Sequence, residues 1–275
     1  VYRKLFAAKM NDYDLVFVGF APQLIVPFWR KIRKKTLVID FFISMYDTLV
    51  CDRKKFREGS LPARLVKHLD KKTLRLADHV ITDTKAHGAY FASELGADLD
   101  KEEVLYLEAD ESIYYKRPQK KSDKLKDKYV VLYFGSILPL QGVEVILEAV
   151  RELKDDPELF FYIIGPLKEG MKAPEGENIS YISWLSQSDL AEKISEADLC
   201  LAGHFNKEIG KARRTIPGKA YIYQAMGKQM LLGDNPATRE LFSEENGDQF
   251  VEMGNPSALA DKIRSMKEGW KGEHR

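Results

Sequence analysis

Cysteine is nearly absent from this sequence. The 275 residues include two cysteines, Cys51 and Cys200, which lie in unrelated segments. We therefore expect neither a disulfide framework nor a cysteine metal cluster, and a reducing, cytoplasmic setting is the simplest interpretation. The sequence also has no run of about 18 apolar residues, so we expect no membrane-spanning helix.

The sequence also has no excess of positive or of negative charge. The chain has 43 basic and 42 acidic residues and a net charge of +1, which indicates no general affinity for nucleic acid. Hydrophobic residues make up 44% and charged residues 31%, as is typical of a globular protein of one large or two ordinary domains. Residues 1–10 have a helical pattern rather than that of a signal peptide, which suggests a fragment.

Apolar strand-like segments alternate with helix-like segments along the whole chain. This alternation predicts an α/β fold with parallel sheets that are covered on both faces. We expect two Rossmann-like doubly wound domains, of which the N-terminal one is incomplete. The expected strands are 15–19, 36–40, 80–82, 104–107, 129–134, 159–164, 179–182, 199–202, 229–232 and 250–251, and the expected helices are 22–34, 61–78, 85–95, 143–153, 188–196, 218–226, 236–242 and 257–267.

A polar segment near mid-chain interrupts the alternation. Residues 116–128 contain seven basic residues, two aspartates and one proline, with no apolar face. We interpret 118–128 as a solvated linker between domains 1–117 and 129–275. The alternative is a basic patch for nucleic acid or membrane. Residues 24–35 join apolar and aromatic residues to five cations, which fits a helix on an anionic membrane surface or a core-facing helix with a basic end.

Glycine-containing loops follow several of the expected strands. In open parallel sheets, ligands bind beyond the carboxyl ends of the strands. Gly135, Ser136, Gln141, Gly142 and Gly165 would lie on that rim and offer backbone N–H groups to a phosphate. Each glycine alone is better explained by a simple turn, but their joint placement on one rim favours a ligand site.

A basic loop provides the matching charge. Residues 207–219 contain five basic residues and one acidic residue. We assign Lys211, Arg213, Arg214 and Lys219 to the phosphates of a ligand, with a solvated basic loop as the alternative. Lys219 is the strongest candidate because a cation in the first turn of a helix opposes the helix dipole.

Two residues are candidates for catalysis. His204 follows a strand and could be a general acid or base, a partner of a sugar hydroxyl or a structural histidine. Asp40 ends an earlier strand and is the best carboxylate candidate in an interdomain cleft. The alternative is that it caps a helix or a turn. Asp83 and His87 form a similar group at the end of another strand.

Together, several short motifs resemble the group 1 glycosyltransferases (family four, GT-B fold). In chain order, the motifs are residues 77–84, 108–110, 134–143, 163–166, 197–198, 216–219 and 254–260. The resemblance implies a retaining transferase that moves a sugar from a nucleotide-sugar to a glycan or lipid-linked acceptor, without a metal or other cofactor. It also implies work in cell-surface polysaccharide synthesis, and that the family's first strands and last helix lie outside this chain, so that the fragment can be inactive.

The sequence departs from the family pattern at four positions. Ser136 and Gln141 replace an arginine and a lysine, and Arg214 and Ile222 align with two glutamates. In a branch of the family with a similar loop, Arg213, Arg214 and Lys219 would replace the missing cations. The loss of the glutamates supports an alternative, a non-catalytic GT-B-like subunit that binds a glycan or a partner protein. A nucleotide-sugar epimerase would share the fold.

Overall fold

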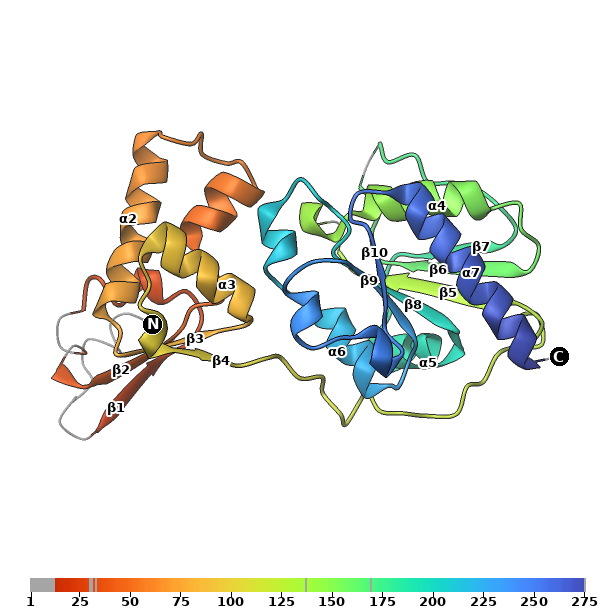
Figure 1. The fold of residues 1–275 in the computed structure, drawn as a ribbon, viewed down its shortest axis with the longest axis horizontal. Coiled ribbons are helices and arrows are strands. Elements are labelled where there is room, and N and C mark those ends of the chain that lie inside the picture. The colour runs from red at the N-terminus through yellow and green to blue at the C-terminus, as the bar shows by residue number, and fades with distance from the viewer. Residues whose placement is uncertain (1–12, 30–31, 33, 137, 169, 275) are drawn as a thin grey trace. The chain divides into compact units, whose positions relative to one another are not determined.

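The computed structural model describes residues 13–274 except 30, 31, 33, 137 and 169, and it divides into two compact units between Tyr106 and Leu107 (Figure 1). Each unit is built on its own parallel sheet. The two sheets agree with the predicted pair of Rossmann-like domains. The helix predicted for residues 1–10 lies outside the described residues.

The first unit contains a four-stranded parallel sheet in the order β1-β2-β3-β4. Its core is formed by apolar side chains of these strands and of the helices beside them, among them Leu37, Ile39, Phe91 and Leu95. The strands are β1 Leu15–Val18, β2 Thr36–Asp40, β3 His79–Thr82 and β4 Glu102–Val104; the helices are α2 Leu61–Leu76, α3 Lys85–Tyr90 and the π-helical turns Asp47–Asp52 and Phe91–Leu95, with 3-10 turns Pro22–Leu24 and Leu99–Lys101.

Most elements predicted for this unit are present, but the helix predicted for residues 22–34 is wrong. The described residues form a 3-10 turn, Pro22–Leu24, followed by further turns. Proline at position 27 has no N–H to continue a helix. Val26 and Trp29 are buried in the core of the unit, so part of the basic segment's apolar side faces inward.

The second unit contains a six-stranded parallel sheet in the order β10-β9-β8-β5-β6-β7. Counted from its own first strand, this is the strand order of doubly wound nucleotide-binding domains. The strands are β5 Tyr129–Phe134, β6 Leu159–Ile164, β7 Ile179–Ile182, β8 Leu199–Gly203, β9 Met230–Gly233 and β10 Gln249–Val251.

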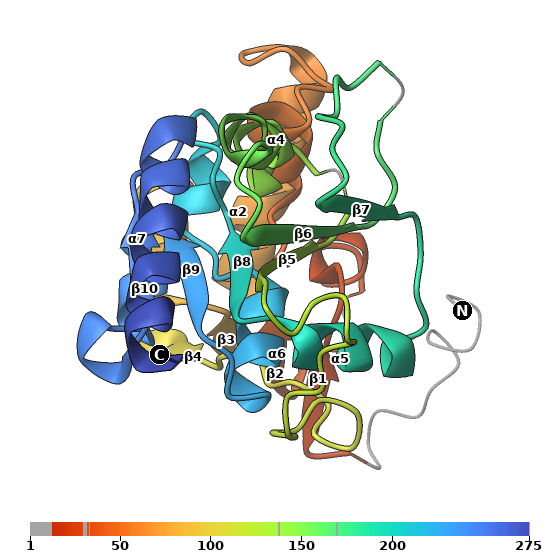
Figure 2. The same cartoon turned by 90° about the vertical axis from the view of Figure 1, so that its right-hand side faces the viewer.

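Helices cover both faces of this sheet (Figures 1 and 2). Helices α4 and α7 pack against one face, where alternate residues of β5 and β6, such as Val131 and Phe161, form the core with Ile146 and Ile263. The helices are α4 Val143–Leu153, α5 Gln187–Glu196, α6 Gly218–Ala225 and α7 Pro256–His274, with 3-10 turns Pro139–Gln141, Gly210–Arg213, Thr238–Glu240 and Glu244–Asn246. The helix predicted for 236–242 is therefore only a short 3-10 turn.

In both units, an aspartate just before a strand forms two hydrogen bonds with one residue of the neighbouring strand. Asp78 precedes β3, and its Oδ2 accepts a hydrogen bond of 2.8 Å from the backbone N–H of Leu37 at the start of β2. Asp198 precedes β8, and its Oδ2 accepts one of 2.7 Å from Val130 in β5. In each case the aspartate's own N–H donates to the same neighbour's carbonyl, at 2.9 Å. The two alanine-aspartate motifs thus align neighbouring parallel strands.

The predicted linker belongs to the second compact unit, which begins at Leu107, before the predicted boundary. Its polar side chains are anchored to the end of α5. Lys121 forms an ion pair of 2.5 Å with Asp198, and Gln119 donates to the carbonyl of Glu196 at 3.0 Å. Composition indicates a polar segment but does not reveal these specific contacts.

Candidate functional site

The strand order of the second unit places a switch point between β5 and β8. These strands are neighbours in the sheet, and the chain continues outward from them in opposite directions. Ligands of open parallel sheets bind in the crevice at the carboxyl ends of the strands that flank such a point. The residues at those two ends are Gly135, which follows β5, and Gly203, which ends β8.

Gly135 and Gly165 bring two strand ends into close contact. The N–H of Gly135 donates to the carbonyl of Ile164 at 2.9 Å, and that of Gly165 donates to Ile182 at 2.8 Å. A Cβ on Gly165 would lie 2.0 Å from the carbonyl oxygen of Gly135, which leaves no space for a side chain. Ser136 follows directly and is exposed at the rim.

The loop after β5 also contacts the loop after β8. The N–H of Phe205 donates to the carbonyl of Gln141 at 3.2 Å. Gly142 has a φ of 69°, and a Cβ there would lie 2.7 Å from the backbone nitrogen of Asn206. Glycine is therefore required at this position both by its backbone conformation and by the close approach of the neighbouring loop.

Lys219 reaches this junction from the first turn of α6. Its side chain is buried, with 6% of its surface exposed. The ammonium donates to the side-chain carbonyl of Gln141 and lies 4.6 Å from the ring centre of Tyr133. A Cβ on Gly135 would lie 3.0 Å from Lys219 Nζ. Lys219, which the sequence assigns to the phosphates of a ligand, therefore lies against the Gly135 turn.

The electrostatics of Lys219 are those of a cation without a counter-ion. Among the described residues, no carboxylate forms an ion pair with it. Burial lowers the pKa of Lys219 to about 7. An anion placed beside the ammonium would favour its charged form, so the site is suited to an anionic ligand.

His204 lies in the same junction but does not carry a charge near neutral pH. It is buried, with 3% of its surface exposed, and burial together with the nearby charge of Lys219 lowers its pKa to about 3. Its Nδ1 lies 3.5 Å from the hydroxyl of Thr215. A general acid or base works best with a pKa near the operating pH, so this environment favours a positioning or structural role for His204.

The other predicted cations lie in and beside the 3-10 turn Gly210–Arg213. Arg213 is exposed, and Lys211 accepts a hydrogen bond of 3.1 Å through its carbonyl from Thr215. The guanidinium of Arg214 packs over Gly210, where a Cβ would lie 2.9 Å from it. Of the four cations, Lys219 is the one that the described contacts place against the Gly135 turn.

Asp40 lies in the first unit, at the carboxyl end of β2. Burial, opposed by a hydrogen bond from the backbone N–H of Phe42 and helped by the charge of Asp83, raises the pKa of Asp40. Asp83 accepts or shares a hydrogen bond of 2.6 Å with His87 Nδ1. These residues therefore gather at the carboxyl edge of that sheet, as predicted from their positions after strands, and the catalytic role of Asp40 stays a prediction.

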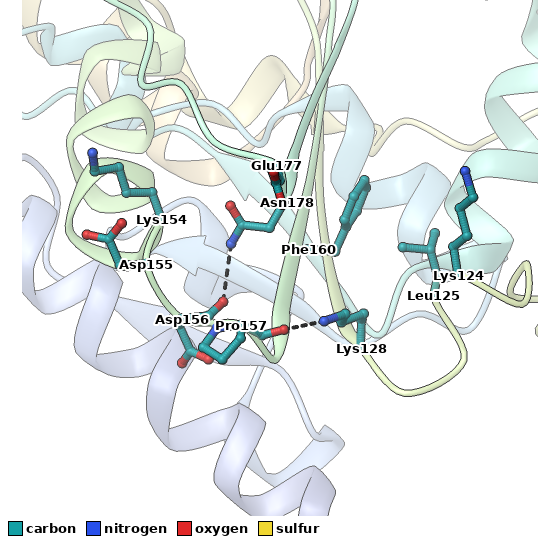
Figure 3. A pocket seen from close by; sticks show the side chains of 10 residues that line it. All are labelled: Lys124, Leu125, Lys128, Lys154, Asp155, Asp156, Pro157, Phe160, Glu177 and Asn178. Carbon is teal, nitrogen blue, oxygen red and sulfur yellow. Dashed lines mark hydrogen bonds between the residues drawn. The ribbon is translucent and has the colours of Figure 1, made fainter.

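A separate cavity of about 390 Å³ lies at the opposite, amino-terminal end of the second sheet (Figure 3). Its walls include Lys128, which donates to the carbonyl of Pro157, and Asn178, which donates to that of Asp156 at 3.2 Å. These polar groups hold a turn between α4 and β6. The cavity lies at the end of the sheet opposite to Lys219. It is therefore not the site of the anionic ligand.

The described part of the chain has neither a metal site nor a membrane-spanning helix. It contains no group of three or more His, Cys, Asp or Glu residues that could hold a metal ion. None of its helices is long and apolar enough to cross a membrane. The metal-independent reaction expected from the sequence stays a prediction.

Sequence reasoning missed two aromatic residues near the rim. Tyr133 was assigned only to a buried strand, yet its buried hydroxyl has no hydrogen-bond partner among the described residues and would lie 3.1 Å from a Cβ on Gly135. Trp184 follows β7 and is 76% exposed. In the sequence, the only indication of a place at the rim was that Trp184 lies two residues after an expected strand.

The chain belongs to the group 1 glycosyltransferases, whose family model matches residues 128–268. A curated relative, the D-inositol 3-phosphate glycosyltransferase of Nocardioides sp., is 23% identical over 82% of this chain and 54% of its own length. The probable glycosyltransferase WbjE of Pseudomonas aeruginosa is 31% identical over 38% of this chain and 27% of its own. The chain thus spans about half the length, or less, of these relatives.

Solved structures show the same fold. Sucrose-phosphate synthase from Thermosynechococcus elongatus superposes with a TM-score of 0.70 at 14% identity, over 97% of this chain and 67% of that one. HepE of Anabaena, solved in complex with UDP, superposes with a TM-score of 0.69 at 15% identity, over 97% of this chain and 72% of that one. At these identities the likeness establishes the GT-B fold alone.

Proposed function

We propose that the protein transfers a sugar from a nucleotide-sugar donor to a glycan or lipid-linked acceptor, with retention of configuration, in cell-surface polysaccharide synthesis. The observation that carries the proposal is the buried ammonium of Lys219, which has no carboxylate partner among the described residues and lies at the switch point of the family's domain. HepE has been solved with UDP and with UDP-glucose, which supports a nucleotide-sugar as the ligand class.

The diphosphate would lie between the Gly135 turn and the start of α6. Lys219 would donate to a phosphate oxygen, and the positive end of the helix dipole at the start of α6 would add to this attraction. Negative charge grows on the leaving diphosphate as the bond to the sugar breaks, so fixed donors at this place would stabilise the transition state. Gln141 would hold the ammonium in position, and Ser136 would offer a hydroxyl at the rim.

The test is incubation of the protein with a panel of nucleotide-sugars and analysis of the released nucleoside diphosphate and sugar. We expect release from at least one donor, with the α or β configuration of the sugar kept, and a loss of about tenfold to a hundredfold in Lys219→Ala, since a hydrogen bond to a charged group contributes about 1.5–3 kcal/mol. Lys126→Ala, which removes an exposed lysine, is the matched control.

A second function is favoured by one observation. Ile222 occupies the place on α6 where the family's second glutamate is expected, and an aliphatic side chain cannot accept a hydrogen bond from a ribose. A non-catalytic subunit that binds a glycan or a partner protein would explain this loss. Binding of nucleoside diphosphates without turnover of any donor would support it, and turnover that is reduced by Lys219→Ala would exclude it.

A further inference from the structure

A basic surface covers the loop before α2 and the outer side of that helix. Residues 53–75, which form it, contain nine lysines and arginines and two acidic residues. Of the two acids, Asp70 is buried and Glu58 is exposed. Since seven of the nine cations are exposed, this surface has a large excess of positive charge.

The fold leaves most of these cations without a counter-charge. Lys67 forms an ion pair of 3.2 Å with Glu94. Among the described residues, the other eight cations form no ion pair with a carboxylate. Their charge is therefore available to a partner outside the chain.

Two exposed leucines lie within the basic surface. Leu61 is 80% exposed and Leu65 is 59% exposed, and they lie about one turn apart on α2. The side of α2 that packs on the unit is formed by Ala63, Val66, Asp70, Thr73 and Leu74. A helix turns by about 100° per residue, so Leu61 and Leu65 lie on the opposite side, beside Arg64. Neither leucine belongs to the core of the unit, and neighbouring large apolar groups in water indicate a binding surface.

The basic surface is supported by a small core of its own. A buried cluster joins the π-helical turn Asp47–Asp52 to α2, and its members are Tyr46, Val50, Ala63 and Val66. The N–H of Phe56 donates to the carbonyl of Leu49 at 3.2 Å. Ser60 caps α2 by accepting a hydrogen bond of 3.4 Å from the N–H of Ala63. The cations and the leucines are therefore presented in a fixed arrangement, which lowers the entropy cost of binding.

The basic surface lies on the side of the first unit to which its strands point. Helix α2 ends at Leu76, shortly before β3, so its first turn lies at the other, carboxyl side of the sheet. In Figures 1 and 2, the loop before α2 projects at the top of the first unit, away from the strands. The surface is thus on the same side of this unit as Asp40 and Asp83.

We propose that the basic surface docks the protein on an anionic lipid membrane. The cations attract negatively charged headgroups, and Leu61 and Leu65 enter the boundary between headgroups and acyl chains. A nucleic acid would use the cations but leave the leucines in water. The inference goes beyond the proposed sugar transfer, because the surface belongs to the first unit and includes no residue of the diphosphate site.

The test is co-sedimentation of the protein with vesicles. Vesicles of phosphatidylcholine alone are compared with vesicles of phosphatidylcholine and phosphatidylglycerol in equal parts. We expect binding to the anionic vesicles, binding to the neutral vesicles that is weaker by about tenfold or more, and release from the anionic vesicles at high salt.

Two double variants separate the apolar from the charged contribution. Leu61→Gln/Leu65→Gln keeps the helix propensity and removes the apolar groups, so we expect affinity for anionic vesicles to fall by about tenfold. Arg57→Gln/Arg64→Gln should lower it by about tenfold or more, since each cation near such a surface contributes about fivefold. Thermal unfolding followed by circular dichroism verifies that both variants are folded.

The matched controls remove the same groups elsewhere. Leu99→Gln removes another exposed leucine of the first unit, and Lys124→Gln/Lys126→Gln removes two exposed lysines of the polar segment. Both should bind as the wild type does. An equal loss in Lys124→Gln/Lys126→Gln would assign membrane binding to the polar segment and overturn the inference.

Three further results would overturn it. They are absence of vesicle binding by the wild-type protein, equal binding to neutral and anionic vesicles, and wild-type binding by both folded double variants. Vesicle binding is measured without a nucleotide, so its failure would leave the proposed function intact, and failure to bind nucleoside diphosphates would leave the docking surface intact.

Discussion

The ammonium of Lys219 donates a hydrogen bond to the side-chain carbonyl of Gln141, a residue 78 positions earlier in the chain. The contact joins the start of α6 to the loop after β5, so it closes the two loops on each other. A neutral amide orients the lysine without neutralising it. The positive charge at this junction is therefore left for a ligand.

Binding of a diphosphate should depend on pH through Lys219. Its pKa is about 7 in the ligand-free protein because the side chain is buried, and a bound phosphate would raise it. Binding above pH 7 must then take up a proton, so pyrophosphate affinity should fall as pH rises from 7 to the pKa of the complex. Calorimetry at pH 8 in buffers of different ionisation enthalpy measures this uptake. An enthalpy that does not depend on the buffer would contradict the assignment.

Lys219→Met should make the protein more stable although it weakens binding. A buried ammonium without a counter-ion is unfavourable, and methionine removes the charge while filling the space. We expect a gain of about 1 kcal/mol in the free energy of unfolding at pH 7 or below. The pKa of Lys219 is lower folded than unfolded, so wild-type stability rises from pH 7 upward and the gain shrinks. Urea unfolding at several pH values tests this, and lower stability of Lys219→Met at pH 6 would contradict it.

Gly165→Ala should disrupt both the fold and the site. A Cβ there would collide with the carbonyl of Gly135, and the φ of 132° is unfavourable for alanine. We expect a loss of at least about 2 kcal/mol in the free energy of unfolding and loss of pyrophosphate binding. Gly247→Ala is the matched control, because its φ is also positive but no atom lies within 4 Å. Equal effects of the two substitutions would show that the contact with Gly135 is unimportant.

Asp198→Asn should be more costly than Asp78→Asn. Both aspartates accept a hydrogen bond from a neighbouring strand, but the side chain of Asp198 is 6% exposed and pairs with Lys121, whose side chain is 9% exposed. Removing one charge of a buried pair leaves the other without a partner, which costs about 3 kcal/mol. Asp78 is exposed, and its substitution should cost less than about 1 kcal/mol. Chemical denaturation of both variants measures the difference, and similar losses would contradict the role of the ion pair.

The sequence was sufficient to predict the parallel α/β architecture and the family. Continuous apolar strands such as β5 carry a signal that does not depend on distant contacts. The helix predicted for residues 22–34 was wrong because Pro27 has no N–H with which to continue it. The contacts of the polar segment with the second unit, such as that of Lys121 with Asp198, could not be predicted because the two residues are distant in sequence.

The site could be predicted only in part from the sequence, because some of its properties depend on contacts between residues that are distant in the chain. The glycine turns and Lys219 could be placed from their positions after strands and at a helix start. The neutral state of His204 could not, because it results from burial and from the charge of Lys219. The exposure of Trp184 could not be predicted, because it is visible only in three dimensions.

The central claim is that Lys219 supplies the positive charge for the diphosphate of a nucleotide-sugar. Calorimetric titration of nucleoside diphosphates and pyrophosphate at pH 7 into the wild-type protein, Lys219→Ala and Lys126→Ala tests it most directly. We predict measurable wild-type binding, a loss of about tenfold to a hundredfold for both ligands in Lys219→Ala, and no change in Lys126→Ala. Wild-type affinities in Lys219→Ala would contradict the account.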